Sequence, residues 1–199
     1  MIIKNNLEQP IPKSFIANRF FFFIVISKVL LKLFGWNISG QIPDEKKLIA
    51  IAAPHTSNWD FVIAMLAILS LDIKVKWLGK ESIFKNGTTW FFKWLGGIPV
   101  NREKPASLIE DIAKIVEQDN SVIVAITPEG SRKKVDKWKS GFLRIAEITK
   151  GKILLISLDF PTKEIHIGEI FIPSGNKEID IEFVKKYYSS FQGIHPENS

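Results

Sequence analysis

The chain of 199 residues contains no cysteine. This absence excludes disulfides, thiolate metal sites and cysteine nucleophiles, and it leaves the redox compartment undetermined, although a cytosolic setting fits. Histidine is also scarce. The three histidines are His55, His166 and His195, and their positions do not have the spacing of metal ligands. We therefore expect no metal site.

The chain also lacks an uninterrupted apolar run of the roughly 20 residues that a membrane span needs. Its longest apolar segment, residues 14–34, is broken by Lys28 and Lys32. No small-residue cleavage site follows the apolar run, so the segment is not a clean secretory signal. With Asn18, Lys28 and Lys32 on one face, it fits an interfacial or partly inserted helix better than a buried core helix. A full span fits least well.

Apolar residues make up 46% of the chain and charged residues 24%, a composition typical of one globular domain. The formal net charge of +6 indicates an anionic partner, either nucleic acid, anionic lipid or a phosphorylated substrate. Fifteen phenylalanines and six tryptophans stand against two tyrosines. They form no regular motif of a nucleic-acid reader, so this aromatic content favours a membrane surface.

Residues 1–13 are polar and read as a loosely held arm. Beyond them, apolar runs alternate with amphipathic segments, and the pattern predicts an α/β fold with a largely parallel central sheet flanked by helices. We expect strands at 48–52, 73–78, 98–100, 121–126 and 153–158, and an edge strand at 165–172. Helices are expected at 61–69, 105–118, 139–149 and 179–191, and an aromatic helix or turn at 88–95. The N-terminal arm and membrane-interface helix are assigned to 1–45, and the α/β domain to 46–199, as one domain overall.

Polar residues follow several predicted strands. His55, Lys80, Arg102 and the loop at 129–132 each come after an apolar run. In a parallel sheet, groups delivered past the carboxyl ends of strands converge on one crevice. All four could therefore face one site.

The most informative of these positions is His55, with Asp60 five residues later. A histidine at the end of a buried strand can act as a general base, and a nearby carboxylate can fix its tautomer. The pattern Ser57-x-x-Asp60 equally matches a capping box, in which Asp60 only closes a helix N-terminus.

Two further elements suit an anionic ligand. Arg102 closes the segment 97–102, where its planar guanidinium could grip a phosphate, although a surface arginine in a turn explains it as well. The loop 128–132 combines a carboxylate, a glycine, a hydroxyl and an arginine. It suits an anion too, and a simple Pro-Glu-Gly turn before a solvated basic run is the alternative.

Taken in order, these blocks resemble the lysophospholipid (1-acyl-glycerol-3-phosphate) acyltransferase family over roughly residues 48–160. His55–Asp60 is similar to the family's H-x4-D block, Gly97–Arg102 to its G-x-x-x-x-R segment, and Pro128–Arg132 to its P-E-G-T-R block with Ser131 replacing threonine. Lys80-Glu81 and Trp138–Gly141 resemble two minor segments. The fourth block departs from the family, because Ile153–Phe160 carries Ser157 and Asp159 and no proline before Pro161.

The resemblance implies acyl transfer from a thioester to a lysolipid hydroxyl, with His55 as general base and Asp60 as its orienting group. It implies that the substrates are bound by Lys80, Asn101, Arg102, Glu129, Gly130, Ser131 and Arg132, and that backbone N–H groups around Gly130 are candidates for the oxyanion site. Acyl-CoA or acyl carrier protein would be a co-substrate and no cofactor is needed. The expected acceptor is 1-acylglycerol 3-phosphate, with lyso-ornithine lipid as the main alternative.

The expected partner is a membrane lipid surface and not nucleic acid, and the expected location is peripheral or monotopic on the cytoplasmic face of the cell membrane. A tunnel for the acyl chain would be lined by Phe61, Met65, Trp90 and Phe92. Two other function classes stay open: a lipid hydrolase that uses a serine such as Ser57, and a peripheral membrane-binding protein without catalysis.

Overall fold

The computed structural model describes residues 6–7, 9–85, 87–101 and 105–198. Its strands are β1 (Asn6–Leu7), β2 (Asn37–Gly40), β3 (Lys47–Ala53), β4 (Val75–Lys80), β5 (Gly97–Val100), β6 (Val122–Ile126), β7 (Lys152–Asp159) and β8 (Glu164–Phe171). Its α-helices are α1 (Phe21–Leu33), α2 (Asn58–Ser70), α3 (Thr89–Trp94), α4 (Pro105–Gln118), α5 (Gly141–Thr149) and α6 (Lys177–Tyr188). Short 3-10 helices are η1 (Lys13–Phe15), η2 (Glu81–Phe84) and η3 (Pro196–Asn198).

The strands form a single sheet in the order β1-β2-β8-β7-β3-β6-β4-β5. Among the described residues, neighbouring strands pair in parallel everywhere except between β7 and β8. The central strands β3, β6 and β7 are nearly continuous apolar runs because both faces of the sheet are covered by helices. The predicted α/β fold with a largely parallel sheet is confirmed.

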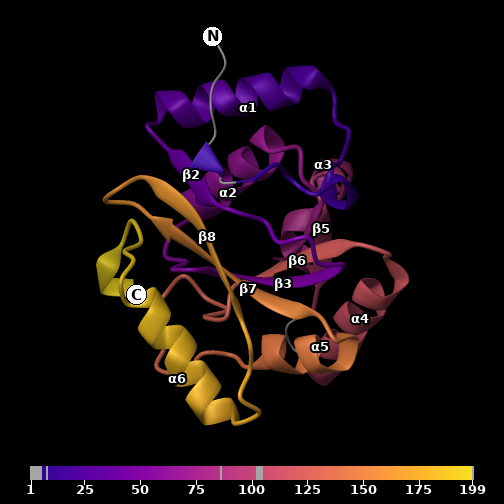
Figure 1. Ribbon diagram of the computed structural model, residues 1–199, viewed down its shortest axis with the longest axis vertical. Coiled ribbons are helices and arrows are strands. Elements are labelled where there is room, and N and C mark those ends of the chain that lie inside the picture. The colour runs from indigo at the N-terminus through magenta and orange to yellow at the C-terminus, as the bar shows by residue number, and fades with distance from the viewer. Residues whose placement is uncertain (1–5, 8, 86, 102–104, 199) are drawn as a thin grey trace.

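The helices form a layer on each side of the sheet (Figure 1). One core lies under α1 and α2, where Ile63, Ile68 and Leu31 pack on Leu48 and Leu154. The other lies under α4, α5 and α6, and there the buried side chains include Ile112, Phe142 and Val184. The helix predicted at residues 105–118 is confirmed, because α4 begins and ends at those residues. Pro105 is its first residue, a position at which proline is favoured.

The N-terminal part of the chain differs from its prediction. Within the stretch expected to be a loose arm, Asn6–Leu7 pairs with β2, and Leu7 and Ile11 pack against the first core. The β2 strand in turn pairs with β8, so β8 lies inside the sheet and not at its edge as predicted. The error arose because alternating polarity also describes an interior strand whose faces are covered unequally.

The α1 helix begins later than its apolar composition suggests. Asn18, predicted to share a face with Lys28 and Lys32, has a φ of 56° and lies before the helix. The backbone N–H groups of Asn18 and Arg19 donate to the carboxylate of Asp72, at 3.1 and 3.0 Å. The Arg19 guanidinium donates to the carbonyl of Ile73, which ties the entry of α1 to the end of α2. No helix within the described residues is long and apolar enough to cross a membrane.

Candidate active site

Four parallel neighbours in the sheet, β3, β6, β4 and β5, end at the same edge. The residues that follow them are His55 after β3, the 127–132 loop after β6, Lys80 at the end of β4 and Asn101 after β5. The structure thus places the predicted polar groups on adjacent strand ends. Arg102 lies outside the described residues.

His55 and Asp60 contact each other directly. The imidazole Nδ1 lies 3.0 Å from Asp60 Oδ2. An ionised carboxylate only accepts hydrogen bonds, so Nδ1 carries the proton and donates a hydrogen bond to Asp60. In the neutral imidazole this leaves the lone pair on Nε2 free to take a proton. The His55 side chain is 24% exposed, whereas that of Asp60 is 4% exposed.

Asp60 also closes the start of α2. Its Oδ2 accepts the backbone N–H of Thr56 at 2.6 Å and of Ser57 at 2.8 Å. Ser57 is the N-cap, and its hydroxyl accepts the N–H of Trp59 at 3.2 Å. The two interpretations of the sequence pattern, a capping box and an orienting carboxylate, therefore describe one arrangement. The cap holds Asp60 still beneath the imidazole.

Glu129 holds the same loop from a different strand. Both of its carboxylate oxygens accept the backbone N–H of His55, at 3.1 and 3.0 Å. The side chain is 6% exposed, and burial raises the pKa of Glu129 to about 7. The hydrogen bond from the His55 backbone and the His55 charge lower that pKa, and the Asp60 charge adds to the rise. Glu129 is thus turned toward the main chain of His55. The sequence predicts that Glu129 binds substrate and does not predict this contact.

The rest of the loop after β6 is arranged around Gly130. This residue has a φ of +65°, and a Cβ there would stand 2.8 Å from Cε of Lys139. Only glycine therefore fits without displacing the lysine side chain. The Gly130 N–H donates to the carbonyl of Thr127 at 3.1 Å, so this particular N–H already has an acceptor within the loop. The Ser131 hydroxyl accepts the N–H of Lys133.

The other predicted binding residues lie at the surface. Lys80, Asn101 and Arg132 are exposed. Of the four side chains predicted to line an acyl tunnel, Phe61 and Phe92 lie in an aromatic cluster with Trp77 and Phe84, and Met65 is buried in the same core. Trp90 is instead 72% exposed. Among the described residues, no three His, Asp or Glu side chains gather in a way that could hold a metal ion.

Tyr188 is a buried residue at the site that the sequence analysis missed. Its hydroxyl donates to the carbonyl of Ile51 at 2.6 Å and accepts the N–H of Ile156 at 3.1 Å. It therefore links the backbones of β3 and β7 a few residues before His55. The rarity of tyrosine in this chain was the one available signal.

Residues 36–159 match the model of a protein family described as Acyltransferase. The chain belongs to the acyltransferase family. The matched acyltransferase region runs from just before β2 to the end of β7, so it includes His55, Asp60 and the loop after β6. The expected enzyme class is thereby confirmed.

Among solved structures, the crystal structure of the 1-acyl-sn-glycerophosphate (LPA) acyltransferase PlsC from Thermotoga maritima is similar to this acyltransferase, with a TM-score of 0.60. Sequence identity is 20%, and the match covers 85% of this chain and 78% of that one. At this identity the likeness supports the fold. No curated protein is significantly similar to the chain in sequence.

Proposed function

We propose that the protein transfers a fatty acyl group from acyl-CoA or acyl carrier protein to the hydroxyl of 1-acylglycerol 3-phosphate, forming phosphatidic acid. The observation that carries this proposal is the His55–Asp60 pair at the strand ends of a chain that belongs to the acyltransferase family. A phosphorylated acceptor is supported by the net charge of +6 and by the exposed Lys80 and Arg132 near the same edge. The substrate named for the Thermotoga maritima enzyme supports the same choice.

His55 is the general base of the reaction. Its Nε2 takes the proton from the acceptor hydroxyl while that oxygen forms a bond to the thioester carbonyl carbon. The tetrahedral intermediate collapses as the carbon–sulfur bond breaks, and the imidazolium returns the proton to the leaving thiolate. Asp60 keeps the proton on Nδ1 and stabilises the imidazolium that forms. The acceptor supplies the nucleophile, so the step needs no cofactor and no acyl-enzyme.

In the same proposal the binding residues divide by position. Lys80, Asn101 and Arg102, at or after the ends of β4 and β5, bind the acceptor phosphate. Arg132 joins them at the acceptor phosphate, and the basic stretch that follows it binds the phosphates of coenzyme A or an acidic acyl carrier protein. Glu129 fixes the backbone of His55 between the two.

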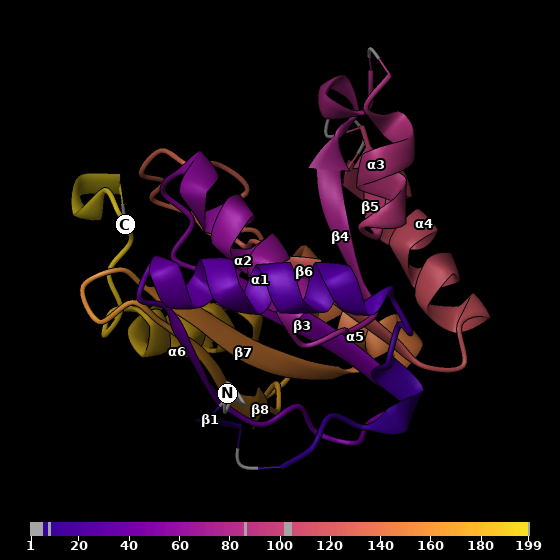
Figure 2. The ribbon, with the colours of Figure 1, turned by 90° about the horizontal axis from the view of Figure 1, so that it is seen from above.

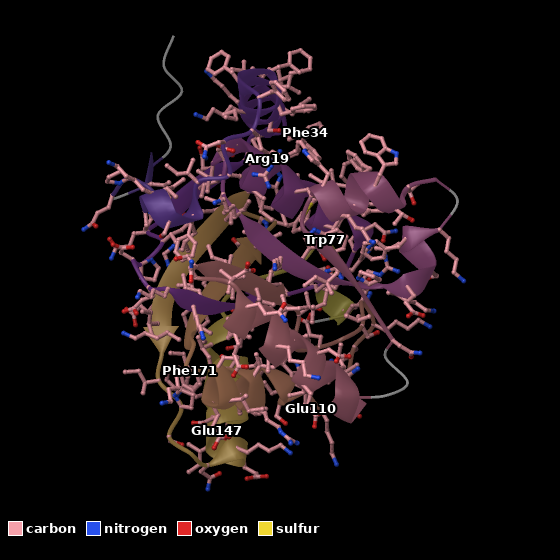
Figure 3. All side chains as sticks on the ribbon, turned by 90° about the vertical axis from the view of Figure 1, so that its right-hand side faces the viewer. Arg19, Phe34, Trp77, Glu110, Glu147 and Phe171 are labelled. Atoms are coloured by element: carbon pink, nitrogen blue, oxygen red, sulfur yellow. The ribbon has the colours of Figure 1, made fainter. Side chains whose placement is uncertain are left out.

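We further propose that α1 and α3 rest on a membrane surface at the cytoplasmic face. Only Ser27 and Leu31 of α1 are buried, whereas Phe21 is 77% exposed and Leu33 74%. The rings of Phe23 and Trp94 lie 5.0 Å apart, which joins the two helices into one apolar surface. Figure 3 shows aromatic side chains standing outward from α1 at the top of the molecule. Exposed aromatics with a few lysines are typical of interfacial helices.

The function is tested with purified protein, acyl-CoA and acyl carrier protein donors, and a panel of lysolipids, with products identified by mass spectrometry. We expect phosphatidic acid from the wild type and none from His55→Ala. The matched control is His166→Ala, which removes an imidazole that lies on β8 and is hydrogen-bonded to Ser39 of β2. Turnover by His55→Ala equal to that of the wild type would refute the general-base role. Exclusive acylation of lyso-ornithine lipid would show that this lipid, and not 1-acylglycerol 3-phosphate, is the acceptor.

The membrane surface is tested by sedimentation with vesicles that contain anionic phospholipid. We expect the double variant F21S/L33S to remain in the supernatant while the wild type sediments. Ile172→Ser is the control, because Ile172 is 81% exposed but does not lie on α1 or α3. It follows Phe171 of β8, which is labelled in the lower part of Figure 3, far from Phe34. Loss of sedimentation in the control alone, or in neither variant, would overturn the assignment.

A further inference from the structure

A C-terminal strap, defined as residues 189–198, crosses from the end of α6 to the loop that carries His55. Figure 2 shows this yellow end of the chain on the same side of the molecule as α2. The backbone N–H of His195 donates to the Thr56 hydroxyl at 3.2 Å. These residues are 139 positions apart in sequence. The family match ends at residue 159, so the strap lies outside it.

The strap is fitted closely to Thr56. Gly193 lies against this side chain so tightly that a Cβ on Gly193 would stand 2.3 Å from Oγ1 and 2.6 Å from Cγ2. Thr56 itself is 4% exposed. Its backbone N–H donates to Asp60, which is also the partner of the His55 imidazole. A displacement of Thr56 is therefore passed on to both members of the catalytic pair.

The strap is anchored before it reaches Thr56. The N–H of Gln192 donates to Asp159 Oδ1 at 2.8 Å, and the N–H of Phe160 donates to the Gln192 carbonyl at 2.9 Å. Asp159 is one of the residues by which the fourth block departs from the family pattern. Just before the strap begins, Tyr188 at the end of α6 donates to the carbonyl of Ile51 on β3. The strap is thus bonded to β7 through Asp159, and the helix end from which it starts is bonded to β3.

We propose that the strap positions the catalytic loop, with Thr56 and Gly193 as positioning residues that act through the Thr56 side chain. This inference rests on the proposed acyl transfer for its kinetic effect. Thr56 need not touch substrate for this role. It holds the backbone between His55 and Asp60, and a small misplacement of a catalytic group is enough to slow chemistry.

The kinetic test compares Thr56→Val with Thr56→Ser. Valine keeps the shape but removes the acceptor for His195 N–H, and we expect kcat to fall about 10- to 100-fold with KM unchanged. Serine keeps the hydroxyl and should keep the wild-type kcat. Thr149→Val is the matched control, since Thr149 is also 4% exposed and its hydroxyl donates to Ile145 in α5, away from the site. A Thr56→Val enzyme that loses stability like this control but keeps kcat, or that changes only KM, would overturn the proposal.

A second test uses the close contact at Gly193. Gly193→Ala should lower kcat, because the new methyl group pushes Thr56 and the strap apart. In the background of Thr56→Ala, which removes the two nearest atoms, Gly193→Ala should have little further effect, since both changes act through one contact. Simple additivity of the two losses would contradict the proposal.

A spectroscopic measurement separates this inference from the proposed function. With three histidines in the chain, the Nδ1-bound proton of His55 can be assigned by NMR from His→Gln variants. We expect Thr56→Val to broaden or shift this resonance, and Thr56→Ser and Thr149→Val to leave it in place. If the wild type acylates no acceptor, the proposed function fails while this resonance still tests the strap. An unchanged resonance in Thr56→Val would refute the strap itself.

Discussion

Glu129 provides a prediction whose size follows from its burial. Its side chain is 6% exposed and its pKa lies near 7 in the folded protein. In the unfolded chain the same group titrates near its ordinary value of 4.5. Because the folded state holds the proton more tightly, the stability contributed by Glu129 is fully present below pH 4.5 and is lost as pH rises toward 7. The full difference is about 3 kcal/mol at 1.36 kcal/mol for each pKa unit.

The assay is urea unfolding of wild type and Glu129→Gln, followed by tryptophan fluorescence at pH 5, 6, 7 and 8. The glutamine side chain can still accept the His55 N–H but does not titrate in this range. The wild-type free energy of unfolding, relative to that of the variant, should fall by about 2.5 kcal/mol between pH 5 and pH 8. A difference that stays constant with pH would refute the argument, because it would mean that Glu129 ionises alike in the folded and unfolded chain.

Three further predictions concern single side chains. Asp60→Asn should keep its helix cap and fold but lower kcat about 100-fold or more by releasing the tautomer of His55, whereas retained turnover with a lower melting temperature would leave only the cap. Tyr188→Phe should lower the free energy of unfolding by about 1–3 kcal/mol, measured by urea unfolding, because two buried backbone groups lose their partner. Gly96→Ala should lower the free energy of unfolding by about 1–3 kcal/mol more than Gly87→Ala does, because both glycines have a positive φ but only at Gly96 would the new Cβ meet a carbonyl oxygen of β4. Equal losses of unfolding free energy in the two variants would contradict this.

Most of the fold could be predicted because its signals are local. The apolar stripe and leading proline of α4 occur within its own 14 residues, and β3, β6 and β7 are each a short continuous apolar run. The β2 strand could not be found in this way. Its four residues, Asn-Ile-Ser-Gly, include one large apolar side chain, which is too few to establish an alternation, and the segment becomes a strand through its pairing with β8, more than 100 residues later.

The same distinction holds at the candidate site. The contact between His55 and Asp60 follows from a spacing of five residues across a strand–turn–helix junction, and the sequence predicts it. The contact of Glu129 with the His55 backbone spans 74 residues and has a main-chain N–H as its donor. Every residue except proline has a main-chain N–H, so the residue type at position 55 does not allow this hydrogen bond to be predicted.

The three contacts on the His55 loop share a physical logic. Asp60 accepts the N–H of Thr56 at the start of its own helix, Glu129 accepts the N–H of His55, and the Thr56 hydroxyl accepts the N–H of His195 in the strap, so each contact gives a backbone N–H a side-chain acceptor. A loop satisfied in this way costs free energy to deform, so the imidazole is held before any substrate arrives. None of these bonds involves the exposed ends of β4 and β5. In the proposed function, Lys80 and Asn101 bind the acceptor and His55 is the base. The acceptor can then change without a change in how the base is held, and we expect the choice of acceptor to be determined at the ends of β4 and β5.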